Sequence, residues 1–542
     1  MKRNGMCPLC YLKQLFTPKS RITSIDVEQD YDNGVTAPPM GWSSWNTFKN
    51  HIDQEMILET AKAMRDKGLI DAGYRYLNLD DCWHDSQRTA EGELQGDRVT
   101  FSMGIAELVK QANAMGLKVG AYSSNGVYTC EDLPASLYHE QKDALTLARW
   151  GIEFFKYDFC HNVAISSYAP LVYAIDVSEI GTGKVLQSIT CDRAVVRGTA
   201  KLMPTNKVAC KRYISGMDKA KGEAIFDNVY VKEGGEYILT LHIVKKGSDY
   251  DKFLRARING KSYYFDIPPQ KVWNTVARFS TQVTLQEGVN VIELTNPIGT
   301  RADSAMLQYY KMGKALQDAA EQVAKEKGEP VKPITFSVCE WGRNDPHNWA
   351  SKTGNMWRTT PDIMPMWWWI MRIYEHNVKL HRYASVGHYN DPDMLEVGNG
   401  KLTREQNKSH FALWCMMNAP LMLGNDVRKI TDDVLSIVTN KALIAINQDE
   451  LGRQAKRIVK GCVDVLAKPL AGGKVAVCFF NKQGFKASKK VDWSKISSDE
   501  YIATTWNGKT LATDVWTGES VTLDELQKIK LDACESKVYV VG

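Results

Sequence analysis

The chain has 542 residues, which is long enough for more than one domain and a large core. Its 44% hydrophobic and 24% charged residues are typical of a globular protein, and a net charge of +5 without a clustered basic stripe argues against a nucleic-acid partner. No apolar run reaches transmembrane length, and residues 1–20 lack the apolar core of a signal peptide. Cys7 and Cys10 have no second cysteine pair at zinc-site spacing, so residues 1–33 are predicted to be a disordered leader.

Strands and amphipathic helices alternate over residues 34–162, the first part of a predicted catalytic domain. Strands are expected from residue 37 and over residues 74–79, 117–122 and 152–157, with helices between them at 52–67, 101–115 and 137–150. Strands that alternate with helices indicate βαβ units and a parallel sheet.

The pattern changes over residues 163–310, where short alternating strands are separated by Gly and Asn turns. The Asn259-Gly260 dipeptide between two such strands predicts a hairpin. We therefore expect an antiparallel β-sandwich inserted into the first domain. It resembles a carbohydrate-binding module, and its aromatic residues Tyr263, Tyr264 and Trp273 fit a sugar-stacking surface and a sandwich core equally well.

The βα pattern returns over residues 311–451 and brings the number of units to eight, with helices expected at 314–327, 364–374 and 403–417. The sequence therefore predicts an α/β fold, a (β/α)8 TIM barrel interrupted by the inserted sandwich. A small antiparallel β-sandwich is expected after it, over residues 452–542. A doubly wound open sheet would need a Gly-rich first βα turn, which this sequence lacks.

Polar and aromatic residues follow the predicted barrel strands, at the end where barrel enzymes carry their chemistry. They are Trp45, Asp80, Asp81, Tyr122, Lys156, Asp158, Glu340, Arg358, Asp362, Asp391 and Asp393. Acidic groups at separate strand ends repel one another and are a poor design for stability, but they suit a pocket for a polyhydroxylated ligand with two catalytic acids. A metal centre is the competing hypothesis, yet the ten histidines are dispersed and no pair has ligand spacing.

Six ordered motifs resemble glycoside hydrolase family 27, the α-galactosidase and α-N-acetylgalactosaminidase family. They are APPMGWSSW (37–45), NLDDCW (78–83), KYDFC (156–160), CEWG (339–342), WRTTPDI (357–363) and NDPDML (390–395). The resemblance implies a retaining mechanism with Asp158 as nucleophile and Asp362 as general acid/base, their carboxyls roughly 5–5.5 Å apart. Lys156, on the same strand face as Asp158, is expected to hold that carboxyl ionised, and Asp362 is expected to be the less solvated acid.

The same resemblance assigns the sugar contacts. Asp80 and Asp81 would accept hydrogen bonds from the hydroxyls at C4 and C6, which favours galactose over glucose. Lys156 and Arg358 would bind the other hydroxyls, and Trp45 and Tyr122 would form the pocket wall. Glu340 would lie near C2, where a carboxylate suits a free hydroxyl and favours a galactosidase over an N-acetylgalactosaminidase.

Further expectations also follow from the family. Cys130 and Cys160 match a bridged pair, expected to be oxidised if the protein is exported, and a periplasmic or secreted location is expected although the sequence has no signal peptide. No cofactor is required, and a structural calcium ion in the inserted sandwich is compatible with the sequence. The usual Asp after the third strand is replaced by Ser124, which changes the outer rim of the pocket.

The predicted function is that of an exo-acting retaining α-galactosidase that removes terminal galactose from oligo- or polysaccharides. The alternatives are a β-L-arabinopyranosidase or α-N-acetylgalactosaminidase of the same family, or a glycan-binding protein on an inactive barrel. The sequence does not set the oligomeric state.

Overall fold

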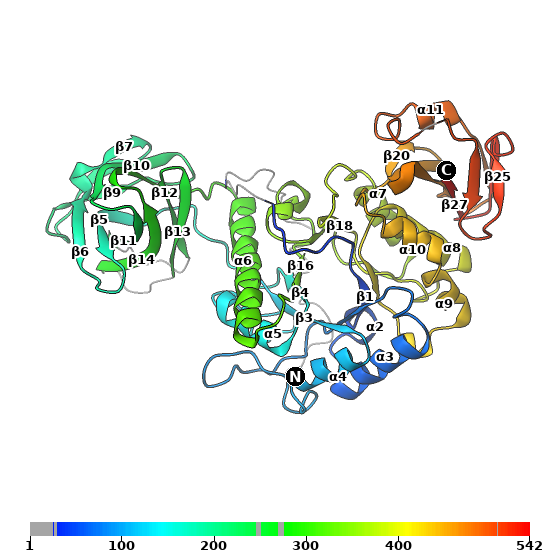
Figure 1. The fold of residues 1–542 in the computed structure, drawn as a ribbon, viewed down its shortest axis with the longest axis horizontal. Coiled ribbons are helices and arrows are strands. Elements are labelled where there is room, and N and C mark those ends of the chain that lie inside the picture. The colour runs from blue at the N-terminus through cyan, green and yellow to red at the C-terminus, as the bar shows by residue number, and fades with distance from the viewer. Residues whose placement is uncertain (1–24, 26–29, 245–250, 269–275, 507) are drawn as a thin grey trace. The chain divides into compact units, whose positions relative to one another are not determined.

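The computed structural model describes residue 25 and residues 30–244, 251–268, 276–506 and 508–542 (Figure 1). Its described residues form two compact units, one of residues 30–162 and 309–542 and one of residues 163–308. Cys7, Cys10 and Trp273 lie outside the described residues. Tyr31 is buried and Asn33 Nδ2 donates to the Ile334 carbonyl at 2.9 Å, so ordered contacts begin before the expected limit at residue 34.

Eight parallel strands form one sheet in the order β18-β17-β16-β4-β3-β2-β1-β19. They are β1 Met40–Ser43, β2 Tyr76–Asn78, β3 Lys118–Ser124, β4 Phe154–Asp158, β16 Thr335–Val338, β17 Met356–Arg358, β18 Tyr389–Asp391 and β19 Leu421–Leu423. A parallel bridge between Leu395 and Leu423 joins the two ends of this order and closes the sheet. The predicted interrupted barrel is confirmed.

Helices lie between and after these strands, and several of them begin at a short polar side chain that caps the first turn. They are α2 Trp45–Phe48, α3 Gln54–Asp66, α4 Ile105–Ala114, α5 Glu140–Trp150, α6 Arg301–Lys327, α7 Trp367–Asn377, α8 Arg404–Met416, α9 Asp432–Val438 and α10 Lys441–Asn447. Asp53 accepts a hydrogen bond from Met56 N at the start of α3, and Thr403 and Gln406 form a capping box at the start of α8. The helix expected from residue 314 begins at Arg301, because its first turns continue the apolar pattern without a break.

The inserted unit contains two antiparallel sheets, whose strands gather into one body in Figure 1. The strands are β5 Leu171–Glu179, β6 Val185–Thr190, β7 Val195–Gly198, β8 Lys201–Pro204, β9 Arg212–Ser215, β10 Gly222–Val231, β11 Gly235–Val244, β12 Lys252–Ile258, β13 Lys261–Ile267, β14 Val276–Leu285 and β15 Gly288–Thr295. Asn259 and Gly260 have φ of 50° and 91° and join β12 to β13, which confirms the predicted hairpin.

The sequence did not decide whether Tyr263, Tyr264 and Trp273 stack on sugars or pack in the core, and the two tyrosines have contacts within this unit. The Tyr263 hydroxyl accepts a hydrogen bond from Thr284 N at 3.0 Å, and its ring packs against the sandwich core. The Tyr264 ring stacks on Phe253 with centroids 5.5 Å apart. These contacts favour a packing role over an open sugar-stacking surface for both tyrosines.

The C-terminal β-structure follows the barrel directly. Its elements are β20 Lys456–Val459, β21 Val463–Leu470, β22 Lys474–Asn481, β23 Ala487–Lys490, α11 Trp493–Ser497, β24 Leu511–Asp514, β25 Ser520–Thr522, β26 Lys528–Leu531 and β27 Ser536–Val541. The buried Asp464 carboxylate accepts from Tyr374 of α7 at 2.9 Å and pairs with Arg457 at 2.9 Å. This buried network ties the sandwich to the barrel.

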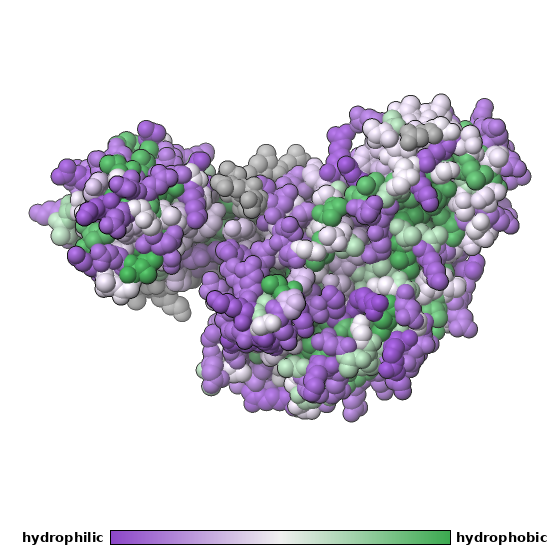
Figure 2. Space-filling model, in the orientation of Figure 1, coloured by the Kyte–Doolittle hydropathy of each residue, from purple (hydrophilic) through white to green (hydrophobic). Residues whose placement is uncertain are grey.

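Hydrophilic residues dominate the face shown in Figure 2, and hydrophobic residues appear there in small groups. Among the described residues, no helix has the length and apolar character needed to cross a membrane.

Candidate active site

Charged residues converge at the carboxyl ends of β2, β4, β17 and β18. The Lys156 Nζ lies 2.8 Å from Asp80 Oδ2, and Ser43 at the end of β1 donates to the same oxygen at 3.3 Å. On the other side, Arg358 Nη2 lies 2.9 Å from Asp362 Oδ1 and 2.6 Å from Asp393 Oδ2. Two cation–carboxylate groups therefore face one region of the barrel mouth.

The nucleophile candidate Asp158 ends β4 and is 5% exposed. Its Oδ1 accepts a hydrogen bond from Phe159 N at 2.8 Å. Burial raises the pKa of Asp158 to about 6, the Lys156 charge opposes this, and the Asp362 charge adds to it. Lys156 thus acts in the direction we expected, but its direct partner is Asp80 and the effect of burial is larger.

Asp362 lies in the loop between β17 and α7, and its side chain is 31% exposed. The expectation that Asp362 is the less solvated of the two acids is therefore wrong. The reason is local: Asp158 belongs to a buried strand, whereas Asp362 stands four residues beyond Arg358 on the barrel rim. Its backbone is nevertheless fixed, because Trp369 Nε1 donates to the Asp362 carbonyl at 2.8 Å.

Asp81 is buried beside Asp80 and is held by backbone amides. Its two oxygens accept from Cys82 N at 2.8 Å and from Glu131 N at 3.0 Å. Burial, followed by the charge of Asp80, raises the pKa of Asp81 to about 7. Asp81 therefore fixes the loop after β3 through Glu131 N, and it is also the sequence neighbour of the sugar-binding candidate Asp80.

The two aromatic wall candidates occupy different environments. Tyr122 in β3 is buried, and Lys156 Nζ lies 5.2 Å from its ring centroid. Trp45 at the start of α2 is half-buried and packs against the cluster that contains Phe154 and Met394. Tyr122 therefore contacts Lys156 directly, while Trp45 packs on the barrel core.

Glu340 follows β16 and has no exposed surface. Its carboxylate accepts hydrogen bonds from Asn344 N at 2.9 Å and from Asn344 Nδ2 at 2.6 Å, and burial raises its pKa to about 8. In this structure the group thus faces Asn344 and shapes the loop after β16. Its expected position near C2 of the sugar stays a prediction.

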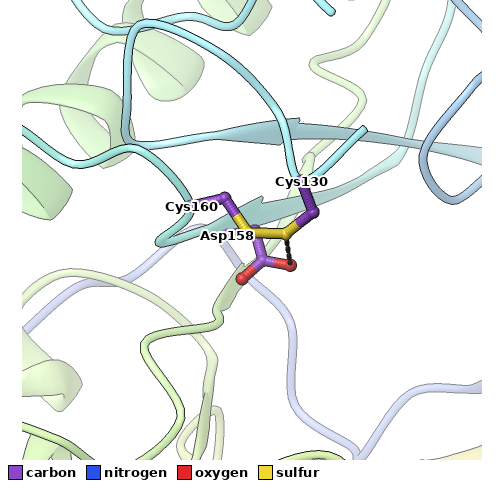
Figure 3. A group of neighbouring side chains, drawn as sticks. All are labelled: Cys130, Asp158 and Cys160. Carbon is purple, nitrogen blue, oxygen red and sulfur yellow. Dashed lines mark hydrogen bonds between the residues drawn. A yellow bond between two sulfur atoms is a disulfide. The ribbon is translucent and has the colours of Figure 1, made fainter. Parts of the chain in front are cut away.

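The predicted cysteine pair forms a disulfide beside the nucleophile candidate, as Figure 3 shows. Cys130 Sγ lies 3.9 Å from Asp158 Oδ2. The three residues form a compact group of metal-ligand type, but sulfurs joined to each other are not the thiolates that metals prefer.

The disulfide instead links the loop after β3 to the end of β4 and fixes the backbone around Asp158. Ser124 belongs to the same region, where it donates to the Cys160 carbonyl at 2.7 Å.

A cavity lies at these strand ends and is lined by residues of several barrel strands. Its charged lining consists of Asp80, Lys156, Arg358, Asp391 and Asp393. Asp158 and Asp362 are not among its lining residues.

Asp393 is a site residue that the sequence placed at a strand end without giving it a role. Its Oδ2 contacts Arg358 and also accepts from Ile363 N at 2.7 Å, directly after Asp362. Its backbone φ of 80° is unusual for a residue other than glycine. Asp393 thereby connects Arg358 to the backbone that carries Asp362. The signal in the sequence was the Asp391-Pro392-Asp393 spacing, which puts two carboxylates at one strand end.

We predict that Asp393→Asn will lower kcat/KM about 10- to 100-fold, because a small displacement of Asp362 is costly to catalysis. Arg358 would lose one of its two carboxylate partners, while the new amide could still accept from Ile363 N. Steady-state kinetics on p-nitrophenyl α-D-galactopyranoside would measure the effect. Asp426→Asn, which breaks a pair with Arg428 elsewhere in the barrel, is the matched control. Unchanged kinetics in Asp393→Asn would show that this connection has no part in catalysis.

A barrel that carries paired carboxylates, a lysine and an arginine at its strand ends belongs to the class of barrel glycoside hydrolases. A family model described as alpha galactosidase A matches residues 37–194 and 279–449, and one for the alpha galactosidase C-terminal beta sandwich domain matches residues 460–541. The chain belongs to the α-galactosidase family and is a glycoside hydrolase. Residues 195–278 of the inserted unit lie outside the matched ranges.

Individual relatives agree with this assignment. An alpha-galactosidase A of Cellvibrio japonicus is 30% identical over 527 residues, covering 93% of this chain and 92% of the relative. An alpha-galactosidase of Cyamopsis tetragonoloba is 30% identical over 94% of this chain and 87% of its own length. The structure of alpha-galactosidase I from Mortierella vinacea has a TM-score of 0.63 at 24% identity, covering 94% of this chain and 98% of its own, and supports the fold.

Proposed function

We propose that this glycoside hydrolase is an exo-acting retaining α-galactosidase that removes terminal α-linked galactose from oligo- or polysaccharides. In the first step Asp158 attacks the anomeric carbon while Asp362 protonates the leaving oxygen, giving a galactosyl-enzyme. In the second step Asp362 takes a proton from water, which attacks the same carbon and releases galactose. Two inversions at one carbon retain the α configuration.

The observation that carries this proposal is the placement of two carboxyls on one rim of the barrel, with Asp158 at the end of β4, Asp362 after β17 and only β16 between these strands. The Asp362 charge is one of the causes that raise the pKa of Asp158, so the two groups act on each other across the barrel mouth. Arg358 holds Asp362 in place from below. A bound substrate would cover Asp362 and exclude water from the acid catalyst.

The sugar would be held by the groups that line the cavity mouth. Asp80 offers acceptors that suit the C4 and C6 hydroxyls, and Lys156 and Arg358 offer donors for the remaining hydroxyls. A periplasmic or secreted setting fits the Cys130–Cys160 disulfide. Sugar binding or calcium binding by the inserted unit stays a prediction.

Initial rates on three p-nitrophenyl glycosides test the substrate. We expect the α-D-galactopyranoside to be cleaved faster than the β-L-arabinopyranoside, which lacks the C6 arm, and the α-N-acetylgalactosaminide, which carries a bulky C2 group. NMR of the first product should show α-galactose. A preference for either other sugar would leave the family assignment intact and overturn the proposed substrate. No cleavage of any of the three would favour a glycan-binding protein.

The acid side of the pH profile should follow Asp158. Because this carboxyl must be ionised to attack and burial raises its pKa to about 6, we predict that kcat/KM falls as the pH is lowered through about 6. α-Galactosyl fluoride is the best substrate for the measurement, since fluoride leaves without acid catalysis. A profile that stays flat down to pH about 4, the usual Asp range, would contradict the assigned environment.

A further inference from the structure

The proposed reaction fixes the side on which the leaving group lies. A general acid must reach the leaving oxygen, so the leaving group that carries this oxygen has to lie beside Asp362. The start of α7 contacts Asp362, because Trp369 Nε1 donates to the Asp362 carbonyl. Its sequence opens with Trp367, Trp368 and Trp369, three consecutive tryptophans.

Two of these tryptophans have packing partners that explain them. Trp369 is 4% exposed, donates to the Asp362 carbonyl, and has the Arg372 guanidinium 4.9 Å from its ring. Trp367 lies 6.1 Å from Phe480 of the C-terminal sandwich in an edge contact. Both rings therefore fix the start of α7, and with it the backbone of Asp362.

Trp368 has a different environment. It is 60% exposed, although an indole is among the side chains that gain most from burial. Its ring meets Trp369 edge-on with centroids 5.2 Å apart, and the Trp369 indole in turn donates to the Asp362 carbonyl. Met366, two residues earlier, is 39% exposed. Apolar surface is therefore exposed at the start of α7, close in sequence to Asp362.

We propose that Trp368 forms a binding platform for the leaving-group sugar, the ring released from galactose. The indole face would stack on the apolar C–H face of that ring, while Trp369 keeps the platform at a constant distance from Asp362. This inference rests on the proposed function and extends it, because it assigns the site to substrates in which a second sugar ring carries the galactose.

Three substrates separate this platform from other roles. Melibiose has a second sugar ring, glucose, as its leaving group and needs acid catalysis. Methyl α-D-galactopyranoside needs acid catalysis but has no second ring. α-Galactosyl fluoride has no second ring and does not need acid catalysis. We expect Trp368→Ala to lower kcat/KM for melibiose about three- to tenfold, mainly through KM, the range typical of one aromatic contact. The methyl glycoside and the fluoride should change less than twofold, and Trp368→Phe should recover most of the loss.

Phe485→Ala is the matched control, since Phe485 is 64% exposed and lies in the C-terminal sandwich. Equal losses on melibiose and the methyl glycoside would mean that Trp368 acts by positioning Asp362, which would overturn the platform. Unchanged melibiose kinetics would overturn it as well. If the wild-type protein cleaves none of the three galactosides, the proposed function itself fails, so the two failures are distinguishable.

A second inference concerns two cysteines of the inserted unit. In the β5–β6 pair Ala174 lies opposite Thr190, so Cys191 follows at the position opposite Tyr173. Cys210 Sγ lies 3.8 Å from the Tyr173 carbonyl oxygen, and both cysteines pack in the same core cluster. Burial, and after it the neighbouring Cys210 side chain, raise the pKa of the Cys191 thiol. Cys191 and Cys210, which precede and follow β7 and β8 in the chain, thus lie close together at one end of β5.

We infer that Cys191 and Cys210 form a second disulfide in the oxidising setting that Cys130–Cys160 indicates. The two thiols would lose two protons and two electrons to a disulfide oxidant, which is reduced to two thiols. The new bond would close the loop that holds β7 and β8 and so restrict the unfolded chain.

Alkylation under denaturing, non-reducing conditions tests this bond after incubation with oxidised glutathione. The chain has twelve cysteines, so eight should react if both disulfides are present and ten if only Cys130–Cys160 is. Peptide mapping should recover Cys191 linked to Cys210, and Cys191→Ser should lower Tm in the absence of reductant and not in its presence. Alkylated Cys191 and Cys210 in a protein whose Cys130–Cys160 bond is intact would overturn the inference.

Discussion

Replacement of Asp158 by Asn is expected to lower kcat about 10⁴- to 10⁶-fold, the range found when a nucleophile is removed from a catalytic unit. The amide has nearly the same shape and can still accept the Phe159 amide proton, so the fold and the adjacent disulfide should persist. What it cannot do is form the covalent bond to the anomeric carbon. Rates on p-nitrophenyl α-D-galactopyranoside would measure the loss, and calorimetric binding of galactose should remain.

Asp71→Asn is a suitable control, because this aspartate is exposed and belongs to the same barrel unit. It should behave like the wild-type protein in both measurements. If Asp158→Asn retained more than a few per cent of the wild-type rate, the nucleophile would have to be another residue.

Replacement of Asp362 by Asn should have the second largest effect, and its size should depend on the leaving group. Loss of a general acid typically costs 10²- to 10⁴-fold, and we expect this range for melibiose, whose sugar leaves poorly without a proton. α-Galactosyl fluoride should react nearly normally in the first step. The comparison of the two substrates measures acid catalysis separately from binding.

Azide distinguishes the roles of the two acids. In Asp362→Asn, azide should attack the galactosyl-enzyme and give α-galactosyl azide, because two inversions restore the original configuration. A single displacement in a protein without its nucleophile would give the β product instead. Asp426→Asn serves as the control, since it breaks a carboxylate–arginine pair elsewhere in the barrel and leaves the acid in place. A uniform loss on melibiose and the fluoride in Asp362→Asn would contradict its role as the acid.

Much of the fold could be predicted because its determinants are local. Strand and helix periodicity placed the eight βα units, and the Asn259-Gly260 turn placed a hairpin whose geometry demands those residues. The start of α6 was misplaced, because nothing in the sequence of residues 301–313 signals a boundary and the helix runs back to Arg301. The convergence of Asp80, Lys156, Asp158, Arg358 and Asp362 followed from parallel strands ending at one edge.

The electrostatic pairing within the site could not be predicted in the same way. The spacing of Lys156 and Asp158 indicated a pair, yet Lys156 pairs with Asp80 from a neighbouring strand. The relative burial of Asp158 and Asp362 depends on strand and loop depth, which a sequence pattern does not encode. Glu340 likewise faces Asn344, four residues on, through a turn of the loop. These features depend on tertiary geometry at the scale of single side chains.

The most direct test of the account is to trap the galactosyl-enzyme with a fluorinated galactosyl fluoride, in which an added fluorine slows the second step. Mass spectrometry of the digested protein should find one galactosyl label, on the peptide that carries Asp158, and wild-type protein protected by excess galactose should label more slowly. A label on any other carboxylate, or hydrolysis with inverted product and no label, would contradict the claim that Asp158 is the nucleophile of a retaining enzyme.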